Sequence, residues 1–333
     1  MTTATILPEL GQLPSLLDTE VALIREVENG LTRPPRSLAP WMFYDAWGSC
    51  LFERITTLPE YYPSRIEREM LVRFGEEIIA RVRPDPPQML RVFELGAGTA
   101  AKTGILLEAA VRNHGRVTYV PCDVSPDALN QACTSIESLL PTVQLQPIVG
   151  NYVTHPPQLV RAKGTTLALY IGTSIGNFSP QAARTILCNL HSQMHSGDAL
   201  LLGTDMVKDE EILLAAYDDE QGVTADFNLN ILRRLNRELS ADFDSAGFRH
   251  RVRWNRADSR IEMHLESLRE QNVRIPAAKL HLHFAQGETI HTENSYKFTQ
   301  NTISALLDDA GFKIAQMWKD PLEWYALTLA GAR

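Results

Sequence analysis

The chain has 333 residues, which by length corresponds to about two domains of ordinary size. Hydrophobic residues make up 44% and charged residues 22%, as in ordinary globular proteins, and no apolar stretch is long enough to span a membrane. The formal net charge is −8, so the totals carry no sign of a nucleic-acid-binding surface. We therefore expect partners that are neither nucleic acid nor membrane.

Cysteine and histidine usage indicates neither a disulfide framework nor a metal site. The four cysteines are scattered without a Cys-x-x-Cys pair, and residues 1–17 lack the basic-then-apolar layout of a signal peptide. These features are typical of reduced thiols in a cytoplasmic protein. The nine histidines show no paired ligand spacing; His281 and His283 share one face of a predicted strand but lack a third ligand. No metal is expected.

The N-terminal segments predict helices and an aromatic layer. A helix is expected over 18–29, and residues 41–62 are dense in aromatic side chains. The adjacent Tyr61 and Tyr62 are difficult to bury together, because each hydroxyl then needs a partner, so we expect at least one to face a site. Ser64 and Glu67 form a Ser-x-x-Glu capping box, which predicts a helix from Ser64 to about Arg81.

After a proline-rich linker at 83–87, strands and helices alternate. Strands are expected over 89–95, 116–122, 143–149, 166–171 and 199–204, and helices over 101–113, 125–139 and 180–195. This alternation predicts a parallel sheet with helices on both faces. Ligands of such sheets bind at the carboxyl ends of the strands, where this chain carries glycines and polar residues.

The first of these strands ends in Glu94, followed by Gly96 and Gly98. Glycines after a strand allow a sharp turn and close approach of a ligand, and the N–H groups of the following helix point to the same place. Ala101 stands at the third position of the dinucleotide fingerprint, which tolerates alanine, so the spacing alone leaves NAD open. The acid before the first glycine instead favours S-adenosylmethionine (SAM), since methyltransferases that use SAM have the pattern acid-x-Gly-x-Gly.

Polar side chains follow the next strands. Asp123 is placed to bind both hydroxyls of a ribose, in SAM or NAD, while Ser125 serves better as the helix cap. Asn151 can pair with the adenine amine, and the ring of Tyr152 can cover the adenine. Lys102 lies in the first turn of a helix, against the helix dipole, and either reaches a carboxylate or points to solvent.

The pattern changes after about residue 205. Helices are expected over 210–217 and 225–239, and strands over 251–254, 260–268, 279–284 and 289–295. A helix over 300–310 and a hairpin-like pair over 313–318 and 324–329 close the chain. An α/β sheet that ends in a helix and an antiparallel hairpin has the layout of class I (Rossmann-like) methyltransferases. The fold class is therefore α/β, with a second α+β domain.

Several local signatures occur in order over nearly the whole chain: Phe43-Tyr44-Asp45, Glu60-Tyr61-Tyr62-Pro63-Ser64-Arg65, Glu94-Leu95-Gly96-x-Gly98-Thr99-x-x-Lys102, Gly172-x-Ser174-Ile175-Gly176-Asn177, Ala216-Tyr217-Asp218-Asp219, Ile261-Glu262-Met263 and Thr292-Glu293-x-Ser295-x-Lys297-Phe298. They resemble the histidine-specific Nα-methyltransferases of ergothioneine biosynthesis. The resemblance implies SAM-dependent trimethylation of the α-amine of L-histidine to trimethylhistidine (hercynine). We expect a monomer with SAM as cofactor, bound by Glu94, Gly96, Gly98, Lys102, Asp123, Asn151 and Tyr152.

The resemblance also implies substrate contacts. Asn177 and Tyr217 resemble the pair that holds the substrate carboxylate, and Tyr61 the tyrosine that lines the pocket. In that picture the α-amine lies near Tyr44 and Gly172.

Ser174 completes the catalytic set that the resemblance implies. Glu293 and Ser295 resemble the pair that reads the two imidazole nitrogens, and their i, i+2 spacing on a strand places both on one face. Met263 is either a residue of the pocket wall or a core methionine. One departure is Asn151, where the family commonly has aspartate; its amide oxygen can still accept from adenine, but without charge.

We expect residues 67–206 and 297–333 to form the SAM-binding domain, and 14–66 and 207–296 the substrate-binding domain. Three alternatives stay open: methylation of another amino acid such as tryptophan, an NAD-type oxidoreductase, and a binding module without activity. Tryptophan fits less well, because an indole has no second ring nitrogen to receive Ser295.

Overall fold

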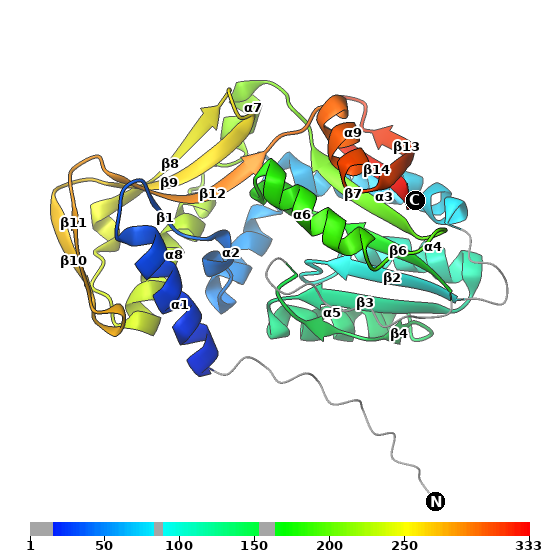
Figure 1. Ribbon diagram of the computed structural model, residues 1–333, viewed down its shortest axis with the longest axis horizontal. Coiled ribbons are helices and arrows are strands. Elements are labelled where there is room, and N and C mark those ends of the chain that lie inside the picture. The colour runs from blue at the N-terminus through cyan, green and yellow to red at the C-terminus, as the bar shows by residue number, and fades with distance from the viewer. Residues whose placement is uncertain (1–15, 83–88, 153–163) are drawn as a thin grey trace, which may run out of the picture.

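The computed structural model describes residues 16–82, 89–152 and 164–333, in which a main sheet and a smaller sheet lie side by side (Figure 1). Residues 14 and 15 of the predicted substrate-binding domain and the predicted linker at 83–87 lie outside these ranges.

The main sheet has eight strands in the order β13-β14-β7-β6-β2-β3-β4, with β5 also paired to β3. The strands from β2 to β7 are parallel. Their bounds are β2 Met89–Leu95, β3 Val117–Asp123, β4 Gln144–Leu145, β5 Ile148–Val149, β6 Gly164–Tyr170, β7 Ala199–Asp205, β13 Phe312–Lys319 and β14 Tyr325–Ala332. The hairpin β13–β14 is antiparallel and joins the sheet through β7.

Helices cover both faces of this sheet. Alternate strand residues belong to different cores: Val92 packs with α3, α4 and α5, whereas the next residue, Phe93, packs with α6 and α9. The bounds are α3 Tyr62–Arg81, α4 Thr103–His114, α5 Pro126–Leu139, α6 Pro180–His191 and α9 Gln300–Asp309. The predicted α/β sheet with helices on both faces is confirmed.

The small sheet has the order β1-β12-β9-β8 and is antiparallel except for the pair β1–β12. A separate hairpin pairs β10 with β11. The bounds are β1 Arg36–Ser37, β8 Phe248–Asn255, β9 Arg260–Ser267, β10 Gln271–Ile275, β11 Leu280–Phe284 and β12 Thr289–Tyr296. Helices α1 Leu16–Leu31, α2 Ala46–Ile55, α7 Glu210–Ala215 and α8 Val223–Leu239 accompany it, with the short 3-10 helices η1 Pro40–Phe43, η3 Ser245–Gly247 and η4 Pro276–Ala278.

One hydrophobic core runs through both sheets. Leu235 of α8 and Leu265 of β9 belong to the same continuous cluster as Leu201 of the main sheet. Phe43 and Phe227 stack within it at a centroid distance of 4.5 Å. The two parts of the chain are therefore packed together and not joined only by linkers.

The structure differs from the sequence predictions at one helix and at several strands. Helix α3 begins at Tyr62 with Pro63 in its first turn, so the predicted Ser64 capping box is wrong and Glu67 lies inside the helix. The strand predicted over 143–149 is interrupted between β4 and β5, where Pro147 has no N–H to donate. Strands β1 and β10 were not predicted.

The described residues contain neither a metal-binding cluster nor a membrane-spanning helix. Across the described residues, no three His, Cys, Asp or Glu side chains are arranged to hold a metal ion. Both His281 and His283 are exposed on β11. Within the same ranges we find no helix with the length and apolar character needed to traverse a bilayer.

Candidate active site

The glycine turn after β2 folds onto Asp123. Gly96 and Gly98 have φ of +71° and +52°, a region that favours glycine. Gly98 N–H donates to Asp123 Oδ2 at 2.9 Å, and Ser125 N–H donates to Oδ1 at the same distance. Burial raises the pKa of Asp123, and these N–H groups oppose it. The helix cap of α5 is Ser125, as predicted, which leaves Asp123 beside the turn.

Glu94 directly precedes this turn, and its buried carboxylate is hydrogen-bonded to the protein. Its buried carboxylate accepts hydrogen bonds from Thr103 Oγ1 at 2.7 and 2.8 Å and from the Tyr119 hydroxyl. Burial raises its pKa to about 7, against the effect of both hydroxyl groups. Because these partners already use the carboxylate, Glu94 positions the start of α4 in this structure.

Lys102 does not point freely to solvent. Its ammonium group forms an ion pair with Glu67, whose side chain is fully buried. Glu67 Oε1 also accepts from Gly172 N–H at 2.8 Å and from the Tyr325 hydroxyl. Glu67 thus links α3 and α4 to the ends of β6 and β14, a role that its local sequence did not reveal.

Tyr152 lies over the glycine turn. A Cβ added to Gly96 would lie 3.4 Å from the Tyr152 hydroxyl oxygen and 3.9 Å from Ser174 Oγ. The ring of Tyr152 meets that of Tyr170 edge-on at 5.7 Å. Asn151 precedes Tyr152 at the same edge of the sheet. The predicted cofactor residues after β2, β3 and β5 are therefore brought together.

The loop after β6 joins this edge to the small sheet. It contains the 3-10 helix η2 (Ser174–Asn177), and both Gly172 and Thr173 have positive φ. A Cβ on Gly176 would lie only 2.8 Å from the carbonyl oxygen of Tyr296, so η2 packs directly on β12. Ser174 Oγ is buried near the hydroxyls of Tyr152 and Tyr170 without a partner at good hydrogen-bond geometry.

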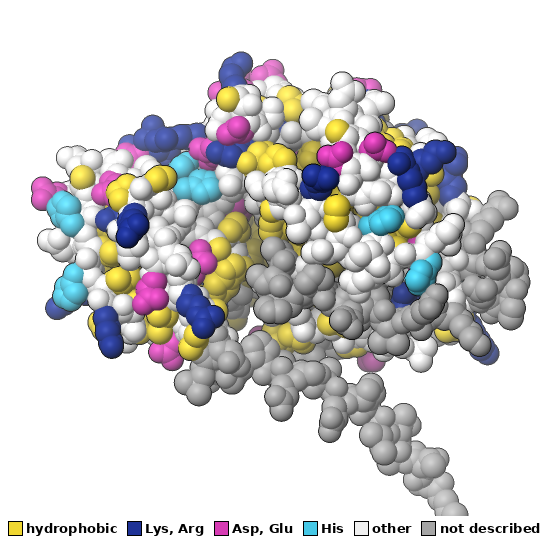
Figure 2. Space-filling view, in the orientation of Figure 1, with side chains coloured by type: hydrophobic (Ala, Val, Ile, Leu, Met, Phe, Trp, Pro, Cys, Tyr) yellow, Lys and Arg dark blue, Asp and Glu magenta, His cyan; other side chains and the backbone are white. Residues whose placement is uncertain are grey.

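Aromatic side chains form the wall between the two sheets. The rings of Tyr61 and Tyr217 meet edge-on at 6.1 Å, and Tyr44 meets Phe52 at 5.7 Å. Burial, and secondly the nearby charge of Glu293, raise the pKa of Tyr44 well above its usual value. Hydrophobic side chains are visible in the hollow between the two parts of the molecule (Figure 2).

A β-bulge turns Glu293 and Ser295 into this wall. The register of β12 on β9 shifts between His291 and Glu293, so Thr292 and Glu293 are both buried and Ser295 follows on the same face. Met263 lies directly across from Glu293 in the pair and also belongs to the core. Both sequence interpretations of Met263 are thus compatible with its position.

The Glu293 carboxylate has no hydrogen-bond partner among the described residues, and the residue is only 8% exposed. Burial raises its pKa to about 7, and the charge of Lys297 only partly opposes this. Ser295 differs, because its Oγ lies 2.7 Å from the Tyr217 hydroxyl and accepts from Lys297 Nζ at 2.8 Å. No protein donor occupies this largely buried carboxylate, so Glu293 is the group of this wall most suited to a ligand donor.

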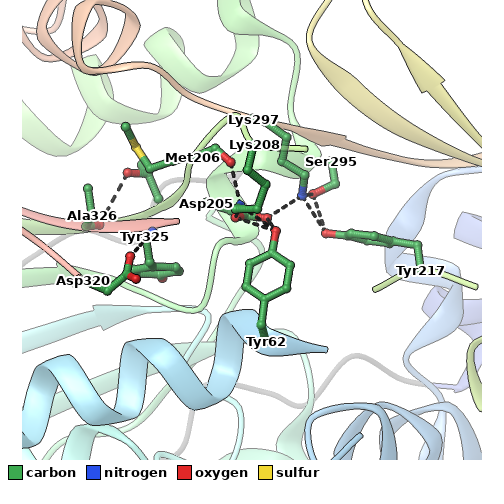
Figure 3. A network of polar contacts seen from close by, with 11 residues as sticks. Tyr62, Asp205, Met206, Lys208, Tyr217, Ser295, Lys297, Asp320, Tyr325 and Ala326 are labelled. Carbon is green, nitrogen blue, oxygen red and sulfur yellow. Dashed lines mark hydrogen bonds and ion pairs between the residues drawn. The ribbon is translucent and has the colours of Figure 1, made fainter. Parts of the chain in front are cut away.

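Behind the wall lies an ionic cluster at the end of β7 (Figure 3). Asp205 accepts from the Tyr62 hydroxyl at 2.9 Å and pairs with Lys297 at 2.7 Å and with Lys208. Burial opposes the ionisation of Asp205, but the two ammonium groups together hold its pKa below the usual range. Burial also lowers the pKa of Lys208 to about 8. Tyr62 therefore finds its hydroxyl partner here, while Tyr61 faces the aromatic wall.

Sequence reasoning missed the roles of Glu67, Asp205, Lys208 and Lys297. Lys297 lies within one of the local signatures, and Asp205 directly follows a predicted strand, so the sequence contained a reason to consider both residues. It contained no such reason for Lys208. A hollow lined in part by Arg81 lies at the opposite edge of the main sheet and contains none of the predicted site residues.

Comparison with known proteins agrees with this arrangement. Residues 23–332 match the histidine-specific, SAM-dependent methyltransferase family. A histidine N-alpha-methyltransferase of Mycolicibacterium smegmatis is 42% identical over 309 residues, which cover 93% of this chain and 94% of that protein. The ergothioneine biosynthesis protein 1 of Schizosaccharomyces pombe is 26% identical over 97% of this chain and 41% of its own length. An L-tryptophan methyltransferase of Psilocybe serbica is 25% identical over 90% of this chain and 89% of its own length. The chain belongs to the family of histidine-specific, SAM-dependent methyltransferases.

Proposed function

We propose that the chain transfers three methyl groups in succession from SAM to the α-amine of L-histidine, giving trimethylhistidine as the first step of ergothioneine biosynthesis. The observation that carries this proposal is Glu293, a buried carboxylate without a partner that faces an aromatic wall. It is suited to a donor on a small, mostly buried ligand, such as an imidazole N–H. The names of the similar proteins support the same substrate.

We propose that the main-sheet part and the small-sheet part of the chain each bind one of the two ligands. Residues 67–206 and 297–333 bind SAM, and residues 14–66 and 207–296 bind the amino acid. On the SAM side, the turn of Gly96 and Gly98 gives a ligand close access to backbone N–H groups, and Asp123 binds the ribose. Asn151 and Tyr152 bind the adenine, and Lys102, paired with Glu67, supplies positive charge for the methionine carboxylate.

On the acceptor side, Glu293 accepts an imidazole N–H and Ser295 lies beside the other ring nitrogen. Tyr217 and Asn177 bind the carboxylate, and Tyr61 and Met263 line the pocket. The α-amine then lies near Tyr44, Gly172 and Ser174, between the two sheets. These roles are supported by the packing of η2 on β12 and by the bulge that turns Glu293 inward.

Methyl transfer from SAM depends mainly on how the amine is positioned against the methyl group. Bound SAM supplies a methyl group on a sulfonium, and displacement needs the amine in line with that bond. The aromatic wall of Tyr44, Tyr61 and Tyr217 excludes water from the nucleophile. The amine must be neutral when it attacks, so an acceptor or water has to take its proton before each transfer.

Mass spectrometry of the reaction of purified protein with SAM and L-histidine tests the proposal. The expected product is heavier than histidine by three methyl groups, with mono- and dimethylated species as intermediates. The matched arm replaces histidine with L-tryptophan, the substrate class in the name of one relative. Faster turnover of tryptophan than of histidine would contradict the assignment of histidine as the substrate. If neither amino acid gave a methylated product, the chain would be a binding module without activity. Family membership argues against the NAD-type alternative.

A further inference from the structure

Lys297 has no role in the function proposed above, yet its side chain is fully buried behind the aromatic wall. Its Nζ donates to Asp205 at 2.7 Å, to Ser295 Oγ at 2.8 Å and to the Tyr217 hydroxyl oxygen at 2.9 Å. An ammonium group has three hydrogens and no acceptor, so this set uses its full capacity. All four side chains appear in Figure 3.

These contacts determine what the two hydroxyls can do. Tyr217 and Ser295 lie 2.7 Å apart, so one hydroxyl hydrogen is used between them and one is left. Since Lys297 donates to both oxygens, each oxygen already accepts a charge-assisted bond. Chains of hydrogen bonds polarise one another, which makes the remaining hydrogen a stronger donor. The pair is thereby set to donate to an acceptor in the pocket.

We propose that Lys297 is a positioning residue for the amino-acid substrate, which orients the hydroxyl pair of Tyr217 and Ser295 so that its one remaining hydrogen is donated to the substrate. This inference rests on the proposed function and deepens it. Tyr217 donates to the substrate carboxylate, and Ser295 retains its place beside the imidazole. Lys297 itself touches the hydroxyls and not the substrate.

The charges of the cluster point the same way. Two ammonium groups, Lys208 and Lys297, share the single carboxylate of Asp205. Of these two ammonium groups, only Lys297 contacts the hydroxyls, so its charge lies directly behind them. An anionic substrate carboxylate in front of the hydroxyls is attracted to that charge, and a cationic group at that place is disfavoured.

Lys208 offers a matched control. It pairs with the same Asp205 and is also buried, but it donates to Tyr62 and to the Met206 carbonyl and contacts neither Tyr217 nor Ser295. If the cluster only held the fold together, Lys208→Met and Lys297→Met would affect substrate affinity to a similar degree. A positioning role predicts an effect specific to Lys297.

The test is calorimetric titration of L-histidine into full-length protein saturated with S-adenosylhomocysteine. Lys297→Met should raise the Kd of histidine by about tenfold or more, the loss expected for a charge-assisted bond. The Lys208→Met variant should stay close to the wild-type Kd. In a Tyr217→Phe background, Lys297→Met should raise Kd less than it does alone, because one of the oriented hydroxyls is absent. Equal effects of the two lysine variants, or equal fold-changes in both backgrounds, would overturn the proposal.

Affinity for S-adenosylhomocysteine and the melting temperature, measured on each variant, report folding separately. If Lys297→Met does not fold, the histidine Kd values of Lys297→Gln and Lys208→Gln are compared by the same criterion. Wild-type protein that binds histidine without methylating it would contradict the proposed function alone, since the comparison of Kd values needs no turnover. Wild-type protein that does not bind histidine would contradict both.

Discussion

Glu293 and Glu262 lie on the paired strands β12 and β9 and show how the surroundings of one carboxylate determine its charge. Burial raises the pKa of Glu293 to about 7 because no donor binds it. For Glu262, partial burial acts in the same direction, but donors that include Asn255 and Arg260 outweigh it and lower the pKa to about 2. Of the two carboxylates, only Glu293 has a binding capacity that the protein leaves unused.

Replacing Glu293 with glutamine should make the ligand-free protein more stable at high pH. A folded pKa of about 7 against an ordinary 4.5 means that the folded state holds the proton more tightly, so the wild type loses stability as pH rises through that window. Glu293→Gln does not titrate. We expect its advantage in unfolding free energy to grow by about 1 to 3 kcal/mol between about pH 5 and about pH 8. Thermal unfolding at several pH values measures it.

The control for this experiment is Glu262→Gln. Its lowered pKa means that the ionised form stabilises the fold, so this variant should lose stability at neutral pH. Glu293→Gln should also raise the KM for histidine while leaving SAM binding near normal. A Glu293→Gln advantage that is constant with pH would contradict the burial of an unpaired carboxylate.

Asp123→Asn tests the SAM side at the same scale. The carboxylate accepts two backbone N–H bonds, from Gly98 and Ser125, and an amide can replace only one of these acceptors. We expect affinity for S-adenosylhomocysteine to fall by about tenfold or more, the loss of a charged acceptor. Calorimetry measures this affinity. The control is Asp127→Asn, because Asp127 is exposed in the first turn of the same helix, α5. Unchanged affinity would remove Asp123 from the site.

At the scale of elements, β12 shows what the sequence can and cannot predict. Its spacing correctly predicted that Glu293 and Ser295 share a face, because strand side chains alternate. Which face is buried depends on the bulge at Thr292, whose hydroxyl donates to Asn228 Oδ1 and to the Met263 carbonyl oxygen. Those partners are distant in sequence, so no local pattern could place the bulge.

Helix α3 gives a second case. A local Ser-x-x-Glu pattern assigned Glu67 to capping, but the helix begins earlier, and the carboxylate binds Gly172 N–H, far along the chain. The strand–helix alternation was readable because hydrophobic periodicity repeats within each element. Polar groups that join elements have no such repeat, which is why the contacts of Glu67 and Asp205 became visible only in the structure.

The contact of η2 with β12 makes a prediction at this scale. Gly176→Ala would place a Cβ 2.8 Å from the Tyr296 carbonyl oxygen, so η2 must move away from β12. Because Asn177 belongs to η2, we expect a higher KM for histidine, with a loss of about 1 to 3 kcal/mol in unfolding free energy. Steady-state kinetics and thermal unfolding measure both. In Gly331→Ala the new Cβ meets nothing within 4 Å, so this control should behave as wild type.

At the scale of the whole molecule, the chain crosses between the two sheets more than once, and one hydrophobic core packs across the junction between them. The exit of β12 runs beside the exit of β7, where Phe298 N–H donates to the Asp205 carbonyl oxygen at 2.9 Å. The same hydrophobic cluster includes Leu23 of α1 and Leu327 of β14. The sequence indicated two domains by a change of pattern, but it carried no sign that they share one core.

A shared core predicts that the molecule unfolds as one unit. Ligands that bind only the folded state stabilise it by about 2.7 kcal/mol at a concentration of 100 times Kd. If both sheets unfold together, S-adenosylhomocysteine should move a single calorimetric transition as a whole, although the ligand contacts mainly the main-sheet side. L-histidine added to that complex should move the same transition further. A shoulder that stays in place when S-adenosylhomocysteine is added would show that the small sheet unfolds independently, and the continuous core would then not couple the two parts.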